Sequence, residues 1–163
     1  MKIVDVYRWL YRGGRPNRVA AALNRWWAMV SSAGLWPNRL AAVEVRGRRT
    51  GRLISFPVVI ADYQGDRFLV AMLGEGTSWV SNVRAAGGRA VLCHGRREAV
   101  HLEEVDPPAR APILRRYLQV APGARPHIPV DRRAPLVDFE RIAGQYPVFR
   151  ILADSVQPDS MSH

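Results

Sequence analysis

The sequence predicts an α+β domain built on an antiparallel, barrel-like sheet. Six short apolar segments have the length of strands, and most of them follow one another through hairpin turns. Helical patterns occur only at the start, in the middle and near the end of the chain. Strands joined mainly by hairpins favour an antiparallel sheet over a parallel βαβ winding. The 163 residues are enough for one domain with a substantial core.

The first three expected strands form a meander. They cover residues 40–46, 53–61 and 67–73. The connection between the first two contains Gly47 and Gly51, and a hairpin turn needs such glycines. Pro57 cannot donate a hydrogen bond to a neighbouring strand, so its strand is expected at an edge or a bulge of the sheet.

The rest of the chain alternates between helical and extended patterns. Thr77 can cap the next helix, and Trp79 and Val83 give that helix an apolar face. The expected elements are, in order, a helix at 77–88, strands at 89–95 and 97–105, a helix at 106–120, a proline-rich loop at 121–135, a helix at 136–146 and a strand at 147–153.

The N-terminal residues form a separate segment. The expected parts of the chain are a helical segment at 1–39, a barrel domain at 40–153 and a polar tail at 154–163. Apolar residues recur at helical spacing within 17–33, so an amphipathic helix is expected there. Such a helix packs on its own domain or lies in a membrane interface. We expect packing, together with peripheral contact to an anionic membrane through three arginines, Arg12, Arg15 and Arg18.

Positive charge is concentrated in the N-terminal third of the chain. The net charge is +10, and residues 1–56 carry eleven Lys or Arg against two acidic residues. This asymmetry indicates an anionic partner such as a phosphate, a nucleic acid or a lipid headgroup. A solvated basic surface without a specific partner explains the same charge and remains open.

Composition and motifs argue against several classes of protein. A single cysteine leaves no internal disulfide and no cysteine-built zinc site, which fits a reducing cytoplasm. No signal-peptide pattern is found, and no apolar run reaches the ~20 residues of a membrane span. The sequence contains no paired catalytic carboxylates, metal-ligand spacing or nucleophile motif. No metal is expected, and an enzyme with this sequence would depend on an organic cofactor.

The turn "GRRTG" at residues 47–51 is the candidate anion site. Its glycines let the backbone N–H groups form a concave nest, and the forked guanidinium groups of Arg48 and Arg49 match phosphate or carboxylate oxygens. Thr50 adds a hydroxyl group. From these residues alone, anion binding and a solubilising turn are equally supported.

Several sequence blocks together resemble the deazaflavin (coenzyme F420)-dependent nitroreductase and quinone reductase family of actinobacteria. The blocks are the strand leading into "GRRTG", the "FPV" of the next strand, and "RFLVAMLGEGTSWVSNVRAAGGRAVL". The similarity extends from about Val43 to Glu104, and "YPVFRI" near the end of the chain adds to it. The resemblance implies a split β-barrel, a bound coenzyme F420 with its phosphate and acidic tail, and hydride transfer to a flat apolar acceptor such as a quinone, a nitro compound or an enone.

The resemblance also implies which residues bind the cofactor. The turn would hold the anionic tail, the next strand would lie under the cofactor, the end of the third strand would face its ring or linker, and the next helix would close the site. The corresponding residues are Arg48, Arg49, Thr50 and Gly51 in the turn, Pro57 and Val58 in the next strand, Ala71, Met72 and Leu73 at the end of the third, and Trp79 and Asn82 in the helix.

One loop departs from the family pattern. Some relatives carry a lysine near the cofactor phosphate, where this chain has Gly74, Glu75 and Gly76. The missing cation and the added carboxylate would weaken binding of the tail, unless Arg46 or Arg52 takes the role of the lysine.

Proton donation to the acceptor has two candidates, Tyr117 and His127. The acceptor pocket is expected over the ring, between the N-terminal helix, Trp79 and the proline-rich loop at 121–130. Hydride transfer needs the acceptor in contact with the ring and shielded from water. We expect an uncharged acceptor, because the sequence offers no charged cluster besides the arginine turn to fix a polar one.

Two other functions remain open. One is a non-catalytic cofactor carrier or nucleic-acid-binding module that uses the basic N-terminal third, with Trp9, Trp26, Trp27 and Trp36 as stacking aromatics. The other is an FMN-dependent oxidoreductase of the same fold, because FMN also ends in a phosphate. The lead hypothesis expects no nucleic acid. Its partners are the apolar acceptor, the membrane surface and, in a homodimer, a second copy of the chain, and it places the protein in the cytoplasm at the inner face of the cell membrane.

Overall fold

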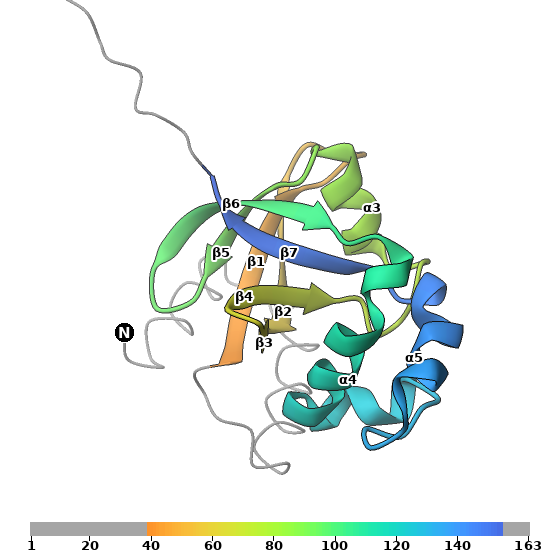
Figure 1. Ribbon diagram of the computed structural model, residues 1–163. Coiled ribbons are helices and arrows are strands. Elements are labelled where there is room, and N and C mark those ends of the chain that lie inside the picture. The colour runs from red at the N-terminus through yellow and green to blue at the C-terminus, as the bar shows by residue number, and fades with distance from the viewer. Residues whose placement is uncertain (1–38, 155–163) are drawn as a thin grey trace, which may run out of the picture.

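The computed structural model describes residues 39–154, which form a seven-stranded antiparallel sheet and its helices (Figure 1). The strands are β1 (Leu40–Arg46), β2 (Leu53–Val59), β3 (Ala61–Tyr63), β4 (Asp66–Val70), β5 (Arg89–Cys93), β6 (Arg97–Glu104) and β7 (Val148–Ala153). The helices are α3 (Ser78–Ala85), α4 (Ala111–Val120) and α5 (Leu136–Ile142), with short 3₁₀ helices η2 (Pro107–Ala109), η3 (Pro122–His127) and η4 (Ala143–Gln145). No helix within 39–154 has the length and apolar character needed to cross a bilayer.

Several expectations concern residues outside this range. They are the amphipathic helix at 17–33, the membrane contact through Arg12, Arg15 and Arg18, the four N-terminal tryptophans, and the polar tail after Asp154.

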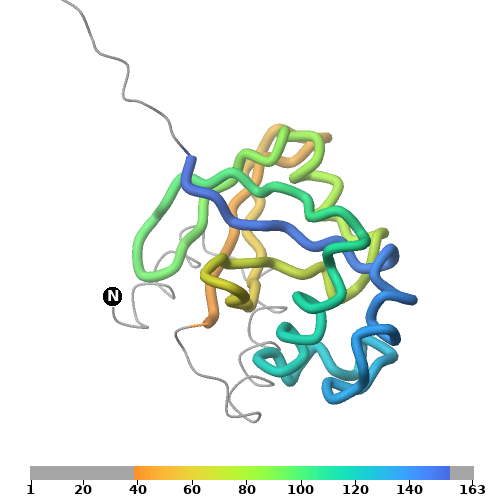
Figure 2. Tube along the Cα trace, in the orientation of Figure 1, coloured from red at the N-terminus to blue at the C-terminus, as the bar shows by residue number. Residues whose placement is uncertain are grey.

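The sheet is curled, and the connection between its two edges explains why. The strand order is β2-β1-β5-β6-β7-β4-β3, so β2 and β3 are the edge strands. These two strands follow each other in the chain and are separated only by Ile60. Since one residue cannot cross a flat sheet of seven strands, the sheet must bend until its edges approach each other. The result is the open barrel whose course is traced in Figure 2, and the predicted α+β split barrel is confirmed.

The strand expected at 40–46 has the bounds that were predicted, and those expected at 89–95, 97–105 and 147–153 are shorter by one or two residues. Two other strands differ more. The segment expected as one strand at 53–61 is divided at Ile60 into β2 and β3, which gives seven strands instead of six. The strand expected at 67–73 ends at Val70, because the chain then turns through Gly74, whose φ is +92°. Pro57 lies in β2, and its expected place in an edge strand is confirmed.

Alternate side chains of the sheet enter two separate cores. On β4, Leu69 faces the barrel interior, whereas Phe68 and Val70 face the layer formed by α4 and α5. The interior core also contains Val43, Val45, Leu92, Val100 and Phe149, together with Val80 and Val83 of α3. The outer core includes Leu114, Tyr117 and Leu118 of α4 and Phe139 of α5. Figure 1 shows the consequence, with α3 at one end of the sheet and α4 and α5 together beside it.

Candidate functional site

The arginine turn at 47–52 has the tight geometry that its glycines allow. The N–H of Gly47 donates to the carbonyl oxygen of Arg52 at 2.7 Å, and the N–H of Gly51 donates to that of Gly47 at 2.9 Å. Gly51 has a φ of +69°, in the region that favours glycine. At Gly47 there is too little space for a side chain, because an added Cβ would lie 2.9 Å from Cδ1 of Ile54.

Arg48 anchors this turn to helix α3. Its backbone N–H donates to Oδ1 of Asn82 at 3.2 Å, and its Nη1 donates to the same oxygen at 2.8 Å. Nη1 also reaches the carbonyl oxygen of Ser78 at 3.5 Å. Asn82 is only 4% exposed, so its amide oxygen holds the turn from a buried position. Two residues expected to bind a cofactor are thus in contact with each other.

Other donors of the turn remain available. The side chain of Arg49 is exposed and forms no ion pair or hydrogen bond with any residue in 39–154. The same holds for the backbone N–H groups of Arg49 and Thr50 within that range. Arg46 donates to the carbonyl oxygen of Gly51 at 2.8 Å and pairs with no described carboxylate. Guanidinium and amide donors without an acidic partner fit a phosphate or a carboxylate tail.

Strand β2 presents its two candidate residues to opposite sides. Val58 is 7% exposed and belongs to the barrel interior, whereas Pro57, the preceding residue, is half-buried on the other face. One ligand therefore cannot contact both side chains. Phe56 shares the inner face, and its ring stacks on Trp79 with a centroid separation of 4.9 Å and an interplanar angle of 17°. Trp79 also contacts the ring of Phe149 at 5.5 Å, so an aromatic cluster closes this end of the barrel.

A cleft of about 490 Å³ opens beside the loop that follows β4. It is lined by Met72, Leu73, Gly74, Glu75, His127, Gly144, Gln145 and Tyr146. Leu73 is 65% exposed and places an apolar side chain at the cleft. Thr77 does not cap α3 with its side chain, because its hydroxyl donates to the carbonyl oxygen of Gly74 at 2.6 Å and braces this loop.

Three of the expected site residues line the cleft, and the others do not, namely Arg48, Arg49, Thr50, Gly51, Pro57, Val58, Ala71, Trp79, Asn82 and Tyr117. Met72, Leu73 and His127 all line it, and the hydroxyl of Tyr146 donates to the carbonyl oxygen of His127 at 3.1 Å. Ala71 is 1% exposed, and its N–H is occupied by the carbonyl oxygen of Pro147 at 2.9 Å. Tyr117 is 2% exposed in the core under α4, away from the residues that line the cleft. Burial raises the pKa of its hydroxyl, which makes it a poorer proton donor.

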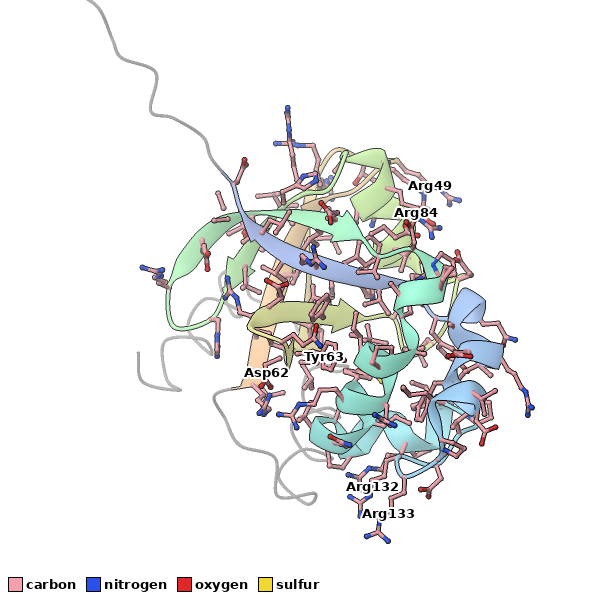
Figure 3. The ribbon with its side chains drawn as sticks, in the orientation of Figure 1. Arg49, Asp62, Tyr63, Arg84, Arg132 and Arg133 are labelled. Carbon is pink, nitrogen blue, oxygen red and sulfur yellow. The ribbon has the colours of Figure 1, made fainter. Side chains whose placement is uncertain are left out.

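Glu75, the carboxylate in the loop after β4, is paired. Its Oε2 accepts a hydrogen bond from Nη1 of Arg84 at 2.9 Å, and its Oε1 accepts one from Nη2 at 3.2 Å. The hydrogen bonds that Arg84 donates to Glu104 and Glu75 raise the pKa of Arg84 further. Figure 3 shows Arg84 and Arg49 on the side of the molecule where α3 lies. The charge of Glu75 is therefore balanced locally by a cation of that helix.

Comparison with known proteins supports the fold. No family model matches the sequence, and no curated protein matches it. A protein of unknown function from Agrobacterium tumefaciens has a similar structure, with a TM-score of 0.52 and 15% identity over 71% of this chain and 48% of that one. This chain thus spans about half the length of the Agrobacterium protein. A structure described as a domain-swapped dimer has a TM-score of 0.50 and 13% identity over 80% of this chain and 97% of that one.

An F420-H2-dependent reductase is also similar, with a TM-score of 0.45 and 15% identity over 72% of this chain and 96% of that one. At such identities the likeness concerns the fold alone. The curled antiparallel sheet is therefore shared, and a function for this chain has to come from its own residues.

Some residues of the site were not expected from the sequence. Gln145 and Tyr146 line the cleft, Phe56 stacks on Trp79, and Arg84 pairs with Glu75. The "FPV" and "YPVFRI" blocks contain two of these residues, but neither block indicates what its side chains contact. Within residues 39–154 no group of three His, Cys, Asp or Glu side chains could hold a metal ion.

Proposed function

We propose that this protein is a deazaflavin-dependent reductase, which transfers a hydride from reduced coenzyme F420 to a flat apolar acceptor. The observation that carries the proposal is the meeting of two features at the start of α3. The arginine turn binds Ser78 and Asn82 of this helix, and the loop that lines the cleft is braced by Thr77, directly before it. An anionic tail and a flat ring on one molecule would need such neighbouring sites.

The residues of the turn fit the anionic part of this cofactor. Arg49 and the N–H groups of Arg49 and Thr50 would hold its phosphate or acidic tail, while Arg48 and Asn82 keep the turn in place. Arg46 and Arg52, which pair with no described carboxylate, add positive charge near the same turn. The pairing of Glu75 with Arg84 reduces the repulsion that its carboxylate would exert on an anion.

The cleft fits a flat, mainly apolar molecule. When bound, reduced F420 supplies the hydride for the reaction. Met72 and Leu73 offer apolar contact, and residues 127 and 144–146 form the other walls of the cleft. His127 is the remaining candidate proton donor, because it lines the cleft whereas Tyr117 is buried elsewhere. The protein would then bind, orient and shield the reactants, and the imidazole of His127 would donate one proton to the acceptor.

An FMN-dependent oxidoreductase is the second candidate, for one reason. The amide and guanidinium donors of the turn fit a single terminal phosphate as well as a longer acidic tail. F420 is preferred because its longer tail would use more of the arginines at 46–52.

Steady-state oxidation of reduced F420 tests the proposal. The purified full chain is given menadione, an aromatic nitro compound or an enone, and in parallel pyruvate, an amino acid or a sugar. We expect turnover with at least one flat uncharged acceptor and none with the small acid or the sugar. Turnover of the charged acid with none of the quinone, nitro compound or enone would contradict the proposal.

A further inference from the structure

Two segments that are distant in the chain form two rims of the cleft. One rim is the loop at 72–75 after β4, and the other is the stretch 144–146 around η4. Their bases are joined through the β4–β7 pairing, where the N–H of Ala71 donates to the carbonyl oxygen of Pro147. Beyond that backbone contact, each rim is held by the guanidinium group of an arginine.

Arg84 holds the first rim and Arg110 holds the second. Arg84 projects from α3 and makes two hydrogen bonds to the carboxylate of Glu75, at 2.9 and 3.2 Å. Arg110 lies just before α4, where its Nη1 donates to the carbonyl oxygens of Ala143 at 3.0 Å and Tyr146 at 3.4 Å. Arg110 is only 2% exposed, so it is a buried cation beneath the wall of the cleft.

Both arginines meet on one carboxylate, that of Glu104 at the end of β6. Its Oε1 accepts a hydrogen bond from Nε of Arg84 at 2.7 Å. Its Oε2 accepts one from Nη2 of Arg84 at 2.9 Å and another from Nη2 of Arg110 at 3.2 Å. Among residues 39–154, Glu104 is the only carboxylate within ion-pair distance of Arg110. The two cations, Arg84 foremost, hold the pKa of Glu104 below its usual range, so it is charged at neutral pH.

We infer that Glu104 is a positioning residue, which sets the spacing of the two rims by holding Arg84 and Arg110 on one carboxylate. A buried guanidinium without a carboxylate is costly, so Arg110 would shift or admit water if Glu104 were neutral. The pair formed by Arg84 and Glu75 is exposed, at 41% and 48%, and such a pair contributes little by itself. Without Glu104, only the backbone contacts at their bases would couple the two rims.

Hydrogen exchange tests this coupling without any ligand. The N–H groups of Gly74, Thr77 and Tyr146 are hydrogen-bonded within the two rims, so they report on each. In the full chain, Glu104→Gln keeps the side-chain shape and removes the charge. We expect exchange about tenfold faster in both rims. Unchanged exchange, or a change in one rim alone, would overturn the inference.

The neighbouring residue provides a matched control. Glu103 precedes Glu104 on the same strand, but it pairs with Arg150 at 3.7 Å, away from the cleft. Glu103→Gln should leave exchange in both rims as in the wild type. If Glu104→Gln unfolds the whole domain, Arg84→Gln is the second variant. It should loosen the loop at 72–76 most and the stretch 144–146 to a smaller extent, because Glu104 then holds Arg110 without its second cation, and loosening of 72–76 alone would contradict the coupling.

A kinetic experiment extends the inference to the acceptor, and this arm rests on the proposed function. With menadione and reduced F420, Glu104→Gln should raise the KM for the quinone about tenfold and change kcat less than about twofold. A fall in kcat at constant KM would contradict a positioning role. If the wild type turns over none of menadione, the aromatic nitro compound and the enone, the proposed function fails, while the exchange experiment still decides the role of Glu104.

Discussion

Arg48 and Arg49 are adjacent in the turn, but their side chains have different roles. Arg48 donates to Asn82 and Ser78 of α3, so it fixes the turn on the helix. Arg49 is exposed and contacts no described partner. The two arginines that the family resemblance assigns to the cofactor tail thus divide into an anchor and an available cation.

Arg49→Ala is expected to weaken binding of oxidised F420 about ten- to a hundredfold. A charge-assisted hydrogen bond contributes ~1.5–3 kcal/mol, and the lost affinity should shrink as salt is raised. Equilibrium titration of F420 at low and high ionic strength measures the change. Arg96→Ala, which removes the same charge from the exposed turn between β5 and β6, is the control and should bind as the wild type does. If Arg49→Ala and the wild type bind F420 with equal affinity, Arg49 does not contribute to the cofactor site.

Asn82→Ala is expected to lower the free energy of unfolding by about 1–3 kcal/mol, because it leaves the donors of Arg48 without their buried acceptor. The double variant with Arg48→Ala should cost little more than Asn82→Ala alone, because Asn82→Ala already removes the side-chain bond that Arg48→Ala removes. Urea denaturation followed by circular dichroism measures these values. Ser81→Ala, the half-buried neighbour on α3, is the control. Fully additive losses would show that Arg48 and Asn82 do not act together.

The residue types of the turn were predictable from the sequence, but their division of roles was not. "GRRTG" indicates an anion site through composition and local glycines. The anchor on Asn82 joins positions 34 residues apart, and no local pattern reveals which of two adjacent arginines makes it. The family resemblance was limited in another way at Pro57 and Val58. It assigns both residues to the cofactor, but side chains alternate along a strand, so these two neighbours face opposite sides of β2.

Among the elements, β3 is tied to α4 and to the start of β1 by one carboxylate. Asp62 accepts hydrogen bonds from Nη2 of Arg116 at 3.1 and 3.3 Å, and Arg39 donates to it as well. These contacts, with Arg39 the largest cause, lower the pKa of Asp62 to about 2. The carboxylate thereby helps to hold an edge strand that has only one neighbour in the sheet.

The contribution of Asp62 to stability should depend on pH in a defined way. Because its pKa falls from about 3.9 in the unfolded chain to about 2 when folded, its stabilisation is complete above about pH 4 and is lost as the pH falls towards 2. Asp62 is exposed, so Asp62→Asn should cost only about 0.5–1 kcal/mol at neutral pH. Thermal melts at pH 6, 4 and 2 should show the gap between wild type and variant closing between pH 4 and 2. A gap that stays constant over this range would contradict the assignment.

The types of the elements were predicted from the sequence more accurately than their first and last residues. Strand and helix patterns located the three α-helices and every strand except the separate β3, because alternation and helical spacing are local properties, whereas η3 lies in the segment expected as a loop at 121–135. The division at Ile60 was missed, since the apolar run continues through it and only the curling of the sheet separates β2 from β3. Thr77 was expected as a cap, and its hydroxyl instead braces Gly74.

At the scale of the molecule, the cleft depends on contacts that no local pattern contains. Its rims come together because Val70 of β4 pairs with Val148 of β7, almost half of the chain away. Glu104 and the two arginines then join β6, α3 and the start of α4 around it. The family resemblance pointed to Met72 and Leu73, and His127 was expected only as a candidate proton donor. The wall formed by residues 144–146 depends on the closure of the sheet and was not predicted.

Parallel titration of the full chain with oxidised F420 and with FMN tests the central claim, that the arginine turn and the cleft form a deazaflavin site. Binding is followed by fluorescence anisotropy at low and high salt. We predict saturable binding of F420 at least about tenfold tighter than that of FMN, weakened by salt and by Arg49→Ala. No saturable binding of F420, or tighter binding of FMN with no effect of Arg49→Ala, would contradict the account.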